Sequence, residues 1–255
     1  MTGRASDRVR LNESKVTLAF ARRRLRDLAN PEDAVFLQRF FKTGPGDYGE
    51  GDEFLGIRVP TIRRLARELR GLSLDDVEAL LQDPSHEARH LALILLVDSY
   101  ARGTSDARAA IVSLYLRNTR WINNWDLVDV SAAGIVGAHL MTRSRRPLDR
   151  LTQSSNVWER RIAIVATHHF IRAGQFDDTL RIAEALMGDS HDLIHKAVGW
   201  MLREVGERDR RTLERFLDAH AREMPRTMLR YAIEKLSPVD RQRFMSARPA
   251  RRTTR

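Results

Sequence analysis

The chain has 255 residues, and its 44 Lys and Arg outnumber its 34 Asp and Glu, which gives a formal net charge of +10 at pH 7. Because a guanidinium binds phosphate oxygens bidentately, this mostly arginine excess indicates a polyanionic partner, most simply nucleic acid. The absence of cysteine excludes disulfides, a thiolate nucleophile and a Cys-ligated metal. No segment is apolar over the length of a membrane span and the polar N-terminus lacks a signal-peptide core, so we expect no membrane partner and a cytoplasmic, nucleoid-associated protein.

The two ends differ from the rest of the chain. Residues 1–12 are small and polar, and residues 248–255 hold four arginines without periodicity, so we expect both segments to be disordered, the second as a basic tail. Residues 13–247 repeat apolar side chains at intervals of three and four, with no sustained alternation. This pattern predicts a single all-α domain.

Cap and turn residues divide that domain into helices of roughly 10 to 20 residues joined by short loops. Asn30-Pro31 predicts a capped helix start, Val59-Pro60 begins a basic helix, and Ser73 precedes two acids that suit a first turn. Helices are expected to stop at Gly71, Gly103, Gly174 and Gly206.

Two early segments bear on anion binding. The glycine-rich stretch 44–53 lacks the Gly-Lys-Ser/Thr ending of a phosphate-binding loop and contains four acids, so it predicts a plain loop and not a nucleotide site. In the basic helix that follows, Arg63, Arg67 and Arg70 are spaced by three and four residues. They form either a stripe that binds DNA phosphates or a solvated face.

Three segments share a Ser cap, an early polar or basic residue and an apolar run; they begin at Ser85, Ser155 and Ser190. The pair Trp125-Asp126 falls midway between the first two, so the unit repeats about every 35 residues, as in HEAT-like helix pairs. We therefore predict an α-solenoid, in which the second helix of each pair lines one concave surface.

One repeat also contains a metal-binding pattern. His86, Glu87 and His90 satisfy H-E-x-x-H, which places two imidazoles one helical turn apart, as a zinc peptidase requires. The sister segments lack the pattern and no third ligand is obvious. Zinc proteolysis is therefore a remote alternative, and we expect no metal.

The run from Trp121 to Asp129 combines two indoles with two carboxylates. Trp125 and Asp129 are four residues apart, as are Lys196 and Trp200, so each pair shares a helix face. A recurring charge beside an indole favours a wet groove over a core stripe, because an unpaired charge is costly to bury. For Asp129 the alternative is a salt bridge to a basic neighbour. We expect Trp121 to pack, and Asp126 to cap the helix or to bond Asn123 or Asn124.

Four blocks of the sequence resemble the bacterial DNA alkylation repair glycosylases of the AlkD-like class. They are FFK before Gly44 with FLGIRVPTIRRL from Phe54, NNWDLVD from Asn123, VWERRIAI from Val157, and HKAVGWMLREVG from His195. The blocks follow the family order over about residues 36 to 206. The resemblance implies a right-handed α-solenoid of HEAT-like repeats with a concave DNA-binding groove.

The resemblance also implies roles for individual residues. Asp129 matches the catalytic aspartate, Trp125 and Trp200 match the two groove tryptophans, and Arg161 matches the arginine near the DNA backbone. Phe40 stands where the family has a groove tyrosine, so the ring is kept and the hydroxyl is lost. We also assign DNA contacts to Arg160, which competes with Arg161 to face the groove, and to Lys196.

The activity implied is that of a monofunctional DNA glycosylase of the 3-methyladenine and 7-methylguanine type. An N3- or N7-alkylated purine is cationic and leaves without protonation, while Asp129 stabilises the oxocarbenium-like sugar and holds the attacking water. The expected partner is alkylated duplex DNA, bound by a monomer without cofactor or obligate protein partner. The main alternative is a non-catalytic HEAT-repeat binder of damaged or branched DNA.

Overall fold

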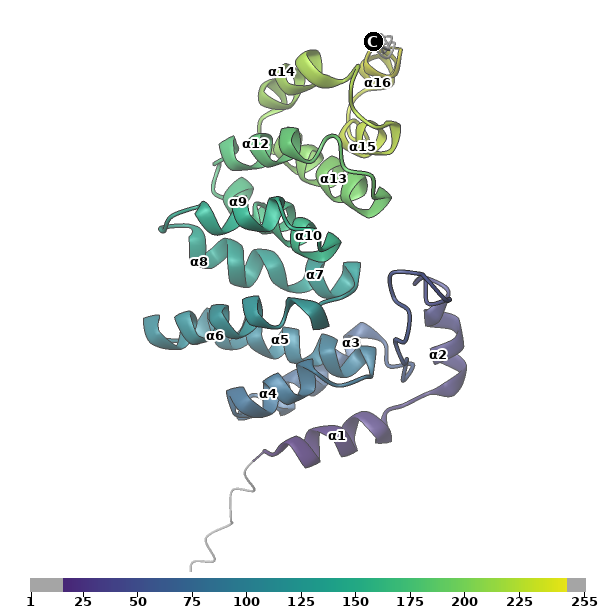
Figure 1. Ribbon diagram of the computed structural model, residues 1–255, viewed down its shortest axis with the longest axis vertical. Helices are drawn as coiled ribbons and strands as arrows, with labels where there is room; N and C mark the ends of the chain where they lie inside the picture. The colour runs from purple at the N-terminus through teal and green to yellow at the C-terminus, as the bar shows by residue number, and fades with distance from the viewer. Residues whose placement is uncertain (1–15, 247–255) are drawn as a thin grey trace, which may run out of the picture.

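The computed structural model describes residues 16–246. Within this range the chain forms helices and no strand, and one isolated parallel bridge joins Glu53 to Ser85. The helices are stacked in successive layers from α1 to α16 along the long axis of the molecule (Figure 1). The prediction of an all-α solenoid is thus confirmed. The two ends predicted to be disordered, residues 1–12 and 248–255, lie outside the described residues.

A central row of helices runs through the stack, each packed on the next. In chain order it consists of α3 (Val59–Glu68), α5 (His86–Arg102), α7 (Trp125–Ala132), α10 (Val157–Ala166), α13 (Asp192–Arg208) and α15 (Arg226–Ala232). The other helices are α1 (Leu18–Asp27), α2 (Pro31–Gln38), α4 (Leu74–Leu81), α6 (Ser105–Arg117), α8 (Ala138–Leu140), α9 (Arg146–Thr152), α11 (His168–Arg172), α12 (Asp177–Ala185), α14 (Arg210–His220) and α16 (Pro238–Met245). A 3₁₀ turn spans Thr119–Trp121 and a π-helical segment spans Ala133–Gly137.

Local chemistry accounts for most of the helix starts. The Asn30 side chain accepts the N–H groups of Glu32 and Asp33, and Pro31 opens α2 with its φ already suited to a helix. Ser73 caps α4 by accepting the N–H of Asp76. The central helices α5, α7, α10 and α13 begin within two residues of the positions that the sequence repeat predicted. The predicted caps Ser155 and Ser190 are wrong, because Asn156 and His191 cap α10 and α13.

One predicted helix stop is wrong. Gly206 lies inside α13, where a Cβ would come within 2.3 Å of Leu213 Cδ2 on α14. This glycine therefore allows two helices to approach closely and does not end one. Gly103 does terminate α5, and Gly174, with φ of +74°, follows α11.

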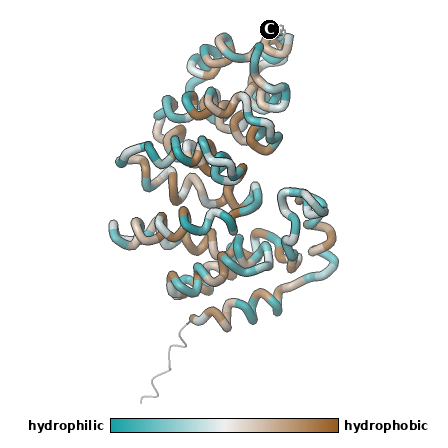
Figure 2. The backbone as a smooth tube through the Cα atoms, in the orientation of Figure 1, coloured by the Kyte–Doolittle hydropathy of each residue, from teal (hydrophilic) through white to brown (hydrophobic). Residues whose placement is uncertain are grey.

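The core runs continuously between the layers, as the hydropathy along the tube indicates (Figure 2). In α5, Leu91, Leu93 and Leu96 are all fully buried although they point in different directions around the helix. A helix that is apolar all round must be covered on all sides, and α5 is packed against α3, α4 and α7. Each such leucine contributes on the order of 1.5–3 kcal/mol through burial. No helix of the described residues is long and apolar enough to cross a membrane.

Helix α2 is an exception to this packing because none of its residues is buried. It stands beside the stack, and the loop that follows it returns alongside the central row (Figure 1). Phe36, which is 44% exposed, and Phe40, which is 59% exposed, form an edge-to-face pair with ring centroids 5.6 Å apart. The segment after α2 forms one wall of the groove described next.

Candidate functional site

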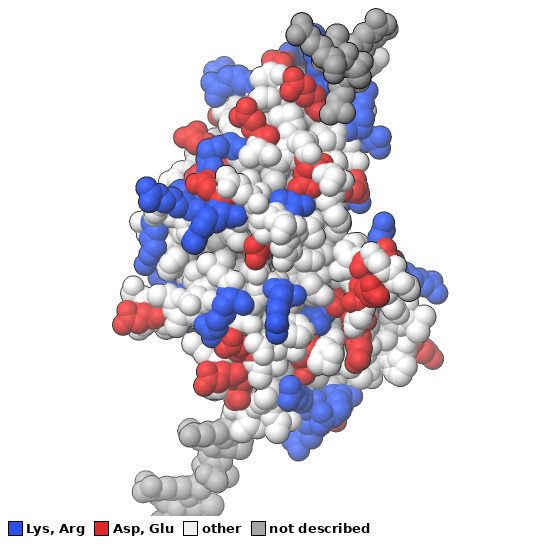
Figure 3. Space-filling view, viewed as in Figure 1, with Lys and Arg blue, Asp and Glu red and all other residues white. Residues whose placement is uncertain are grey.

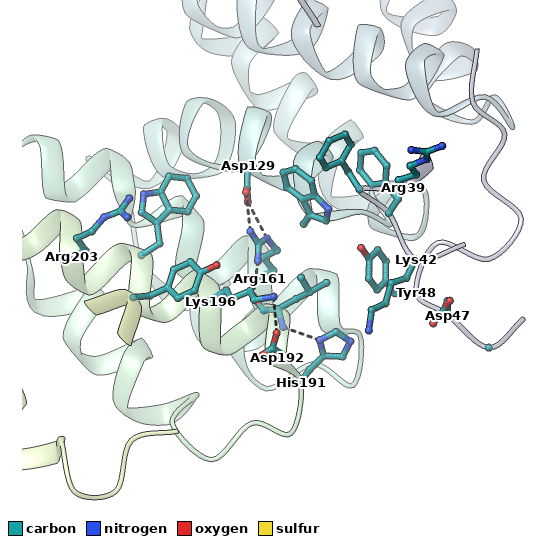
Figure 4. Close-up of a pocket in the computed structure, with 17 residues that line it drawn as sticks. Arg39, Lys42, Asp47, Tyr48, Asp129, Arg161, His191, Asp192, Lys196 and Arg203 are labelled. Atoms are coloured by element: carbon teal, nitrogen blue, oxygen red, sulfur yellow. Dashed lines mark hydrogen bonds and ion pairs between the residues drawn. The ribbon is translucent and has the colours of Figure 1, made fainter. Parts of the chain in front are cut away.

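A groove of about 800 Å³ opens between the segment after α2 and the central helices α7, α10, α13 and α15 (Figure 4). It contains carboxylates, cations and aromatic rings. The lining residues are Arg39, Phe40, Phe41, Lys42, Gly46, Asp47, Tyr48, Trp125, Asp129, Arg161, His191, Asp192, Leu193, Lys196, Trp200, Arg203 and Tyr231. The structure thus brings together the four residues that the resemblance assigns to the site, Trp125, Asp129, Arg161 and Trp200, from three different helices.

Asp129 and Arg161 form a bidentate ion pair at the floor of the groove. Arg161 Nε donates to Asp129 Oδ1 at 3.0 Å and Nη2 donates to Oδ2 at 2.8 Å, while Nη1 donates to the Leu193 carbonyl at 2.6 Å. The Arg161 side chain is only 6% exposed, whereas that of Asp129 remains 21% exposed. The carboxylate is therefore oriented from behind by a buried guanidinium and keeps one face open to the groove.

Burial raises the pKa of Asp129 above its ordinary value of 3.8, and the charge and hydrogen bonds of Arg161 offset only part of this effect. The nearby Asp126 carboxylate raises this pKa further. A carboxylate in such an environment is poorly hydrated, so it interacts strongly with a cation that enters the groove.

The two groove tryptophans are held by residues that sequence patterns did not single out. Trp125 stacks on Phe41, with ring centroids 5.5 Å apart and planes 18° apart. Trp200 donates its indole N–H to Glu204 at 3.0 Å. Glu204 lies one helical turn after Trp200, and this spacing was the only available signal. Both indoles are half-buried and line the groove.

Further aromatic and basic groups surround the carboxylate. Phe40 lines the groove, and Tyr48, eight positions later, supplies a phenol from the same segment. Tyr48 packs edge-on against the buried Trp158, with ring centroids 5.5 Å apart. Lys196 pairs with Asp192 at 2.7 Å, which raises the lysine pKa. The glycine-rich stretch, which was predicted to be a plain loop, therefore contributes groove residues.

The structure separates two of the predicted DNA contacts, Arg161 and Arg160. Arg161 faces the groove, and three of its five N–H groups donate to Asp129 and Leu193, so it orients the carboxylate. Arg160 points elsewhere: its Nε pairs with Asp189 at 2.6 Å and its Nη1 donates to the carbonyls of Ser154 and Ser155. The helix phase thus separates two adjacent arginines onto different faces.

Arg63, Arg67 and Arg70 are exposed but do not line the groove. They border a separate cavity of about 470 Å³ between the α3 segment, α5 and α7. Arg70 is paired with Asp98 at 3.2 Å, so its charge is already partly neutralised. Arg63 and Arg67 remain candidates for phosphate contacts next to the groove.

The H-E-x-x-H pattern has a different role from the one its spacing indicated. The Glu87 carboxylate accepts three backbone N–H groups, from Leu55 and Gly56 at 2.8 Å and from Ile57 at 3.2 Å. It is therefore not available as the general base of a peptidase. The structure does place a third potential metal ligand beside His86 and His90, because their ring nitrogens and an Asp126 oxygen lie within 4.8 Å of one another.

The contacts within this group are those of an ion network. Both nitrogens of His86 face carboxylates, Nε2 at 2.8 Å from Asp126 and Nδ1 at 3.3 Å from Asp52. Burial alone would lower the pKa of His86, but the hydrogen bonds to Asp126 and Asp52 raise it to about 9. Burial raises the pKa of Asp126, and the hydrogen bonds from His86 and His90 outweigh this and lower it. Asp126 is structural, as expected, with histidines of α5 as partners in place of Asn123 or Asn124.

A family model described as DNA alkylation repair enzyme matches residues 21–236. The solved structure of a predicted DNA alkylation repair enzyme from Enterococcus faecalis is similar, with a TM-score of 0.64 and 18% sequence identity over 82% of this chain and 97% of that chain. At this identity the likeness concerns the fold. The comparison with curated proteins found no match.

Proposed function

This chain belongs to the family of DNA alkylation repair enzymes, as its four sequence blocks implied, and we propose that it is an N-glycosylase that releases cationic N3- and N7-alkylated purines from duplex DNA. The observation that carries the proposal is the partly exposed Asp129 carboxylate, fixed by Arg161 and bordered by Trp125 and Trp200 in one groove. All four groups come from a single chain, which supports action as a monomer.

The proposed reaction needs little acid catalysis. An alkylated purine already carries a positive charge, so cleavage of the bond between C1′ and the base nitrogen leaves the base neutral and the sugar oxocarbenium-like. Asp129 stabilises this positive charge and orients a water molecule, whose oxygen bonds to C1′ while its proton passes to the carboxylate or to solvent. Arg161 holds the carboxylate in position, and the indole faces attract the cationic nucleotide. No cofactor enters the scheme.

A second function is favoured by one observation. Arg161 occupies both oxygens of Asp129, which is the salt bridge that a purely structural role requires. A protein that binds alkylated or branched DNA without cleaving it would use the same aromatic and basic groove. The two functions differ in whether the exposed face of the carboxylate acts on the sugar.

The test is base release from a methylated duplex oligonucleotide under single turnover, with DNA binding measured in parallel. The wild-type protein should release 3-methyladenine or 7-methylguanine, and Asp129→Asn should bind DNA with similar affinity while release falls at least about a hundredfold. Asp106→Asn, an exposed acid on α6, serves as the control for a lost surface charge. Wild-type protein that binds and releases nothing would favour the non-catalytic binder. Thermal melting of each variant separates lost chemistry from lost folding.

A further inference from the structure

Residues 31–54, here called the groove arm, form one wall of the groove but contribute almost nothing to the core. Between positions 31 and 50, Gly49 alone is buried. The groove residues that the arm supplies are Arg39, Phe40, Phe41, Lys42, Gly46, Asp47 and Tyr48. The α2 part of the arm stands clear of the stack (Figure 1). Apolar burial, which holds the other helices together, therefore does not explain how this wall is held in place.

The first turn of α5 binds the end of the arm and the residues directly after it through three polar side chains. Arg89 Nη2 donates to Asp52 Oδ1 at 2.6 Å, and His86 Nδ1 lies 3.3 Å from Asp52 Oδ2. Glu87 accepts the N–H groups that immediately follow the arm, at Leu55, Gly56 and Ile57. These α5 side chains are at most 3% exposed. His86 and Arg89 thus bind the arm itself, and Glu87 binds the three residues directly after it.

Asp52 is the acceptor that these contacts between the arm and the stack share, and its hydrogen-bonding network is here called the joint. Besides Arg89 and His86, it receives Asn123 Nδ2 at 3.0 Å and Asn124 Nδ2 at 3.4 Å. The two asparagines directly precede α7, whose first residue is Trp125. His86 extends the joint to Asp126 in the first turn of the same helix. The carboxylate therefore connects the arm to both α5 and the start of α7.

Aromatic rings beside the joint link it to the residues that line the groove. Phe41, in the arm, packs on His86 at 4.9 Å and on Trp125 at 5.5 Å between ring centroids. Stacked rings can slide with little change in energy, whereas several directed hydrogen bonds to one buried carboxylate define a single position. The spacing of the arm from Trp125 is accordingly determined at Asp52.

We infer that Asp52 is a positioning residue, which anchors the groove arm on α5 and α7 and so sets the place of the wall that carries Lys42 and Tyr48 opposite Trp200. The inferred effect on DNA rests on the proposed function, whereas the anchoring itself does not. Asp52 anchors the arm but does not line the groove, so its loss should weaken the binding of duplex DNA more than it slows base release.

Hydrogen exchange of the full chain tests the anchoring directly. In Asp52→Asn, amides 39–54 should exchange at least about tenfold faster than in the wild type, while α10 and α13 should keep their protection. Glu53→Gln is the matched control, because the neighbouring carboxylate is exposed and its loss removes the same charge from the same segment. If Asp52→Asn fails to fold, Asp52→Asn with Arg89→Gln removes both members of the buried pair and leaves neither charge of that pair unpartnered. Unchanged exchange across the arm in the folded variant would overturn the inference.

DNA measurements then separate positioning from a general loss of structure. With Asp52→Asn, the Kd for duplex DNA should rise about tenfold, and the single-turnover rate at saturating protein should stay within about threefold of the wild type. Equal losses in rate and affinity would contradict a positioning role. If the wild type releases no base, the proposed function fails, but exchange and Kd still decide whether Asp52 anchors the arm.

Discussion

At the scale of single residues, two half-buried carboxylates of α7 lie one turn apart and have pKa shifts of opposite direction. Asp126 accepts hydrogen bonds from His86 and His90, and its pKa is lowered against the effect of burial. Asp129 has only Arg161, and burial keeps its pKa raised. The less stabilised carboxylate is the one exposed to the groove. This contrast supports the proposal that Asp129 is the reactive carboxylate and that Asp126 is structural.

The pKa of Asp129 leads to a prediction about Arg161. Because the charge of Arg161 lowers that pKa, Arg161→Gln should raise it further and move the acid limb of the base-release rate to higher pH by about 1 unit or more. The measurement is single-turnover release as a function of pH. Arg160→Gln, which removes the adjacent arginine from its pair with Asp189, should leave the limb where it is. An acid limb that does not move in Arg161→Gln would show that Asp129 is not the titrating group.

His86 leads to a prediction about stability. Its folded pKa of about 9 exceeds the ordinary 6.5, so its stabilising contribution is complete below pH 6.5 and is lost as the pH rises through 9. The full contribution is on the order of 3 kcal/mol. Urea unfolding of the wild type between pH 6 and 9.5 should show this loss, and His86→Gln should largely remove the pH dependence. His220→Gln, at a histidine packed on Phe216, should keep it; a flat wild-type curve would contradict the ion network.

At the scale of helices, close approach across the central row places the groove residues. Gly199 on α13 lies directly before Trp200, and a Cβ at this position would come within 2.4 Å of the Met228 carbonyl and 2.5 Å of Tyr231 Cβ. Both atoms belong to α15, and Tyr231 lines the groove. The contact between α13 and α15 therefore depends on a residue without a side chain.

We expect Gly199→Ala to destabilise the protein. The added methyl group meets backbone, which cannot rotate away, so the cost should be about 1–3 kcal/mol and the melting temperature should fall by roughly 3 to 10 °C. Gly188→Ala is the control, since a Cβ there would meet nothing within 4 Å. Thermal melting followed by circular dichroism compares the two. Equal melting temperatures for both variants would mean that α15 moves away at no cost.

For the whole molecule, the formal net charge is +10. In Figure 3 the cations and acids are spread over the face in view, and many arginines have partners, such as Arg117 with Glu78 at 2.6 Å. The charge excess alone therefore does not locate the DNA path. Under the proposed function the groove is the DNA path, and we propose that the exposed Arg63 and Arg67 extend it.

The salt dependence of DNA binding tests this extension. If Arg63 and Arg67 each neutralise one phosphate, Arg63→Gln and Arg67→Gln should each reduce the slope of log K against log salt by about 0.9, with the rate of base release at saturation unchanged. Arg117→Gln removes the same charge from the α6 surface and should leave the slope as in the wild type. A stripe that is merely solvated would give wild-type slopes for all three variants.

The sequence by itself determined the helical class, the repeat and six of the groove residues. Periodicity of three and four residues is a local property, and a repeat copies it, so both can be read without knowing which helices meet. The motif blocks added the six groove residues Phe40, Trp125, Asp129, Arg161, Lys196 and Trp200. Sequence order could not reveal that Arg161 faces Asp129, because that pairing joins residues 32 positions apart through the packing of α10 on α7.

Only the tertiary structure decided the roles of the groove arm and of the pattern His86 to His90. Asp52 reads as one of several acids in a polar loop, and the histidine pattern reads as a metal site. Both readings change once the loop packs on α5, because burial makes an unpaired charge costly and so forces Asp52, His86 and Arg89 into contact. The need to pair these charges arises only when the folded chain removes them from water, and no local sequence pattern encodes it.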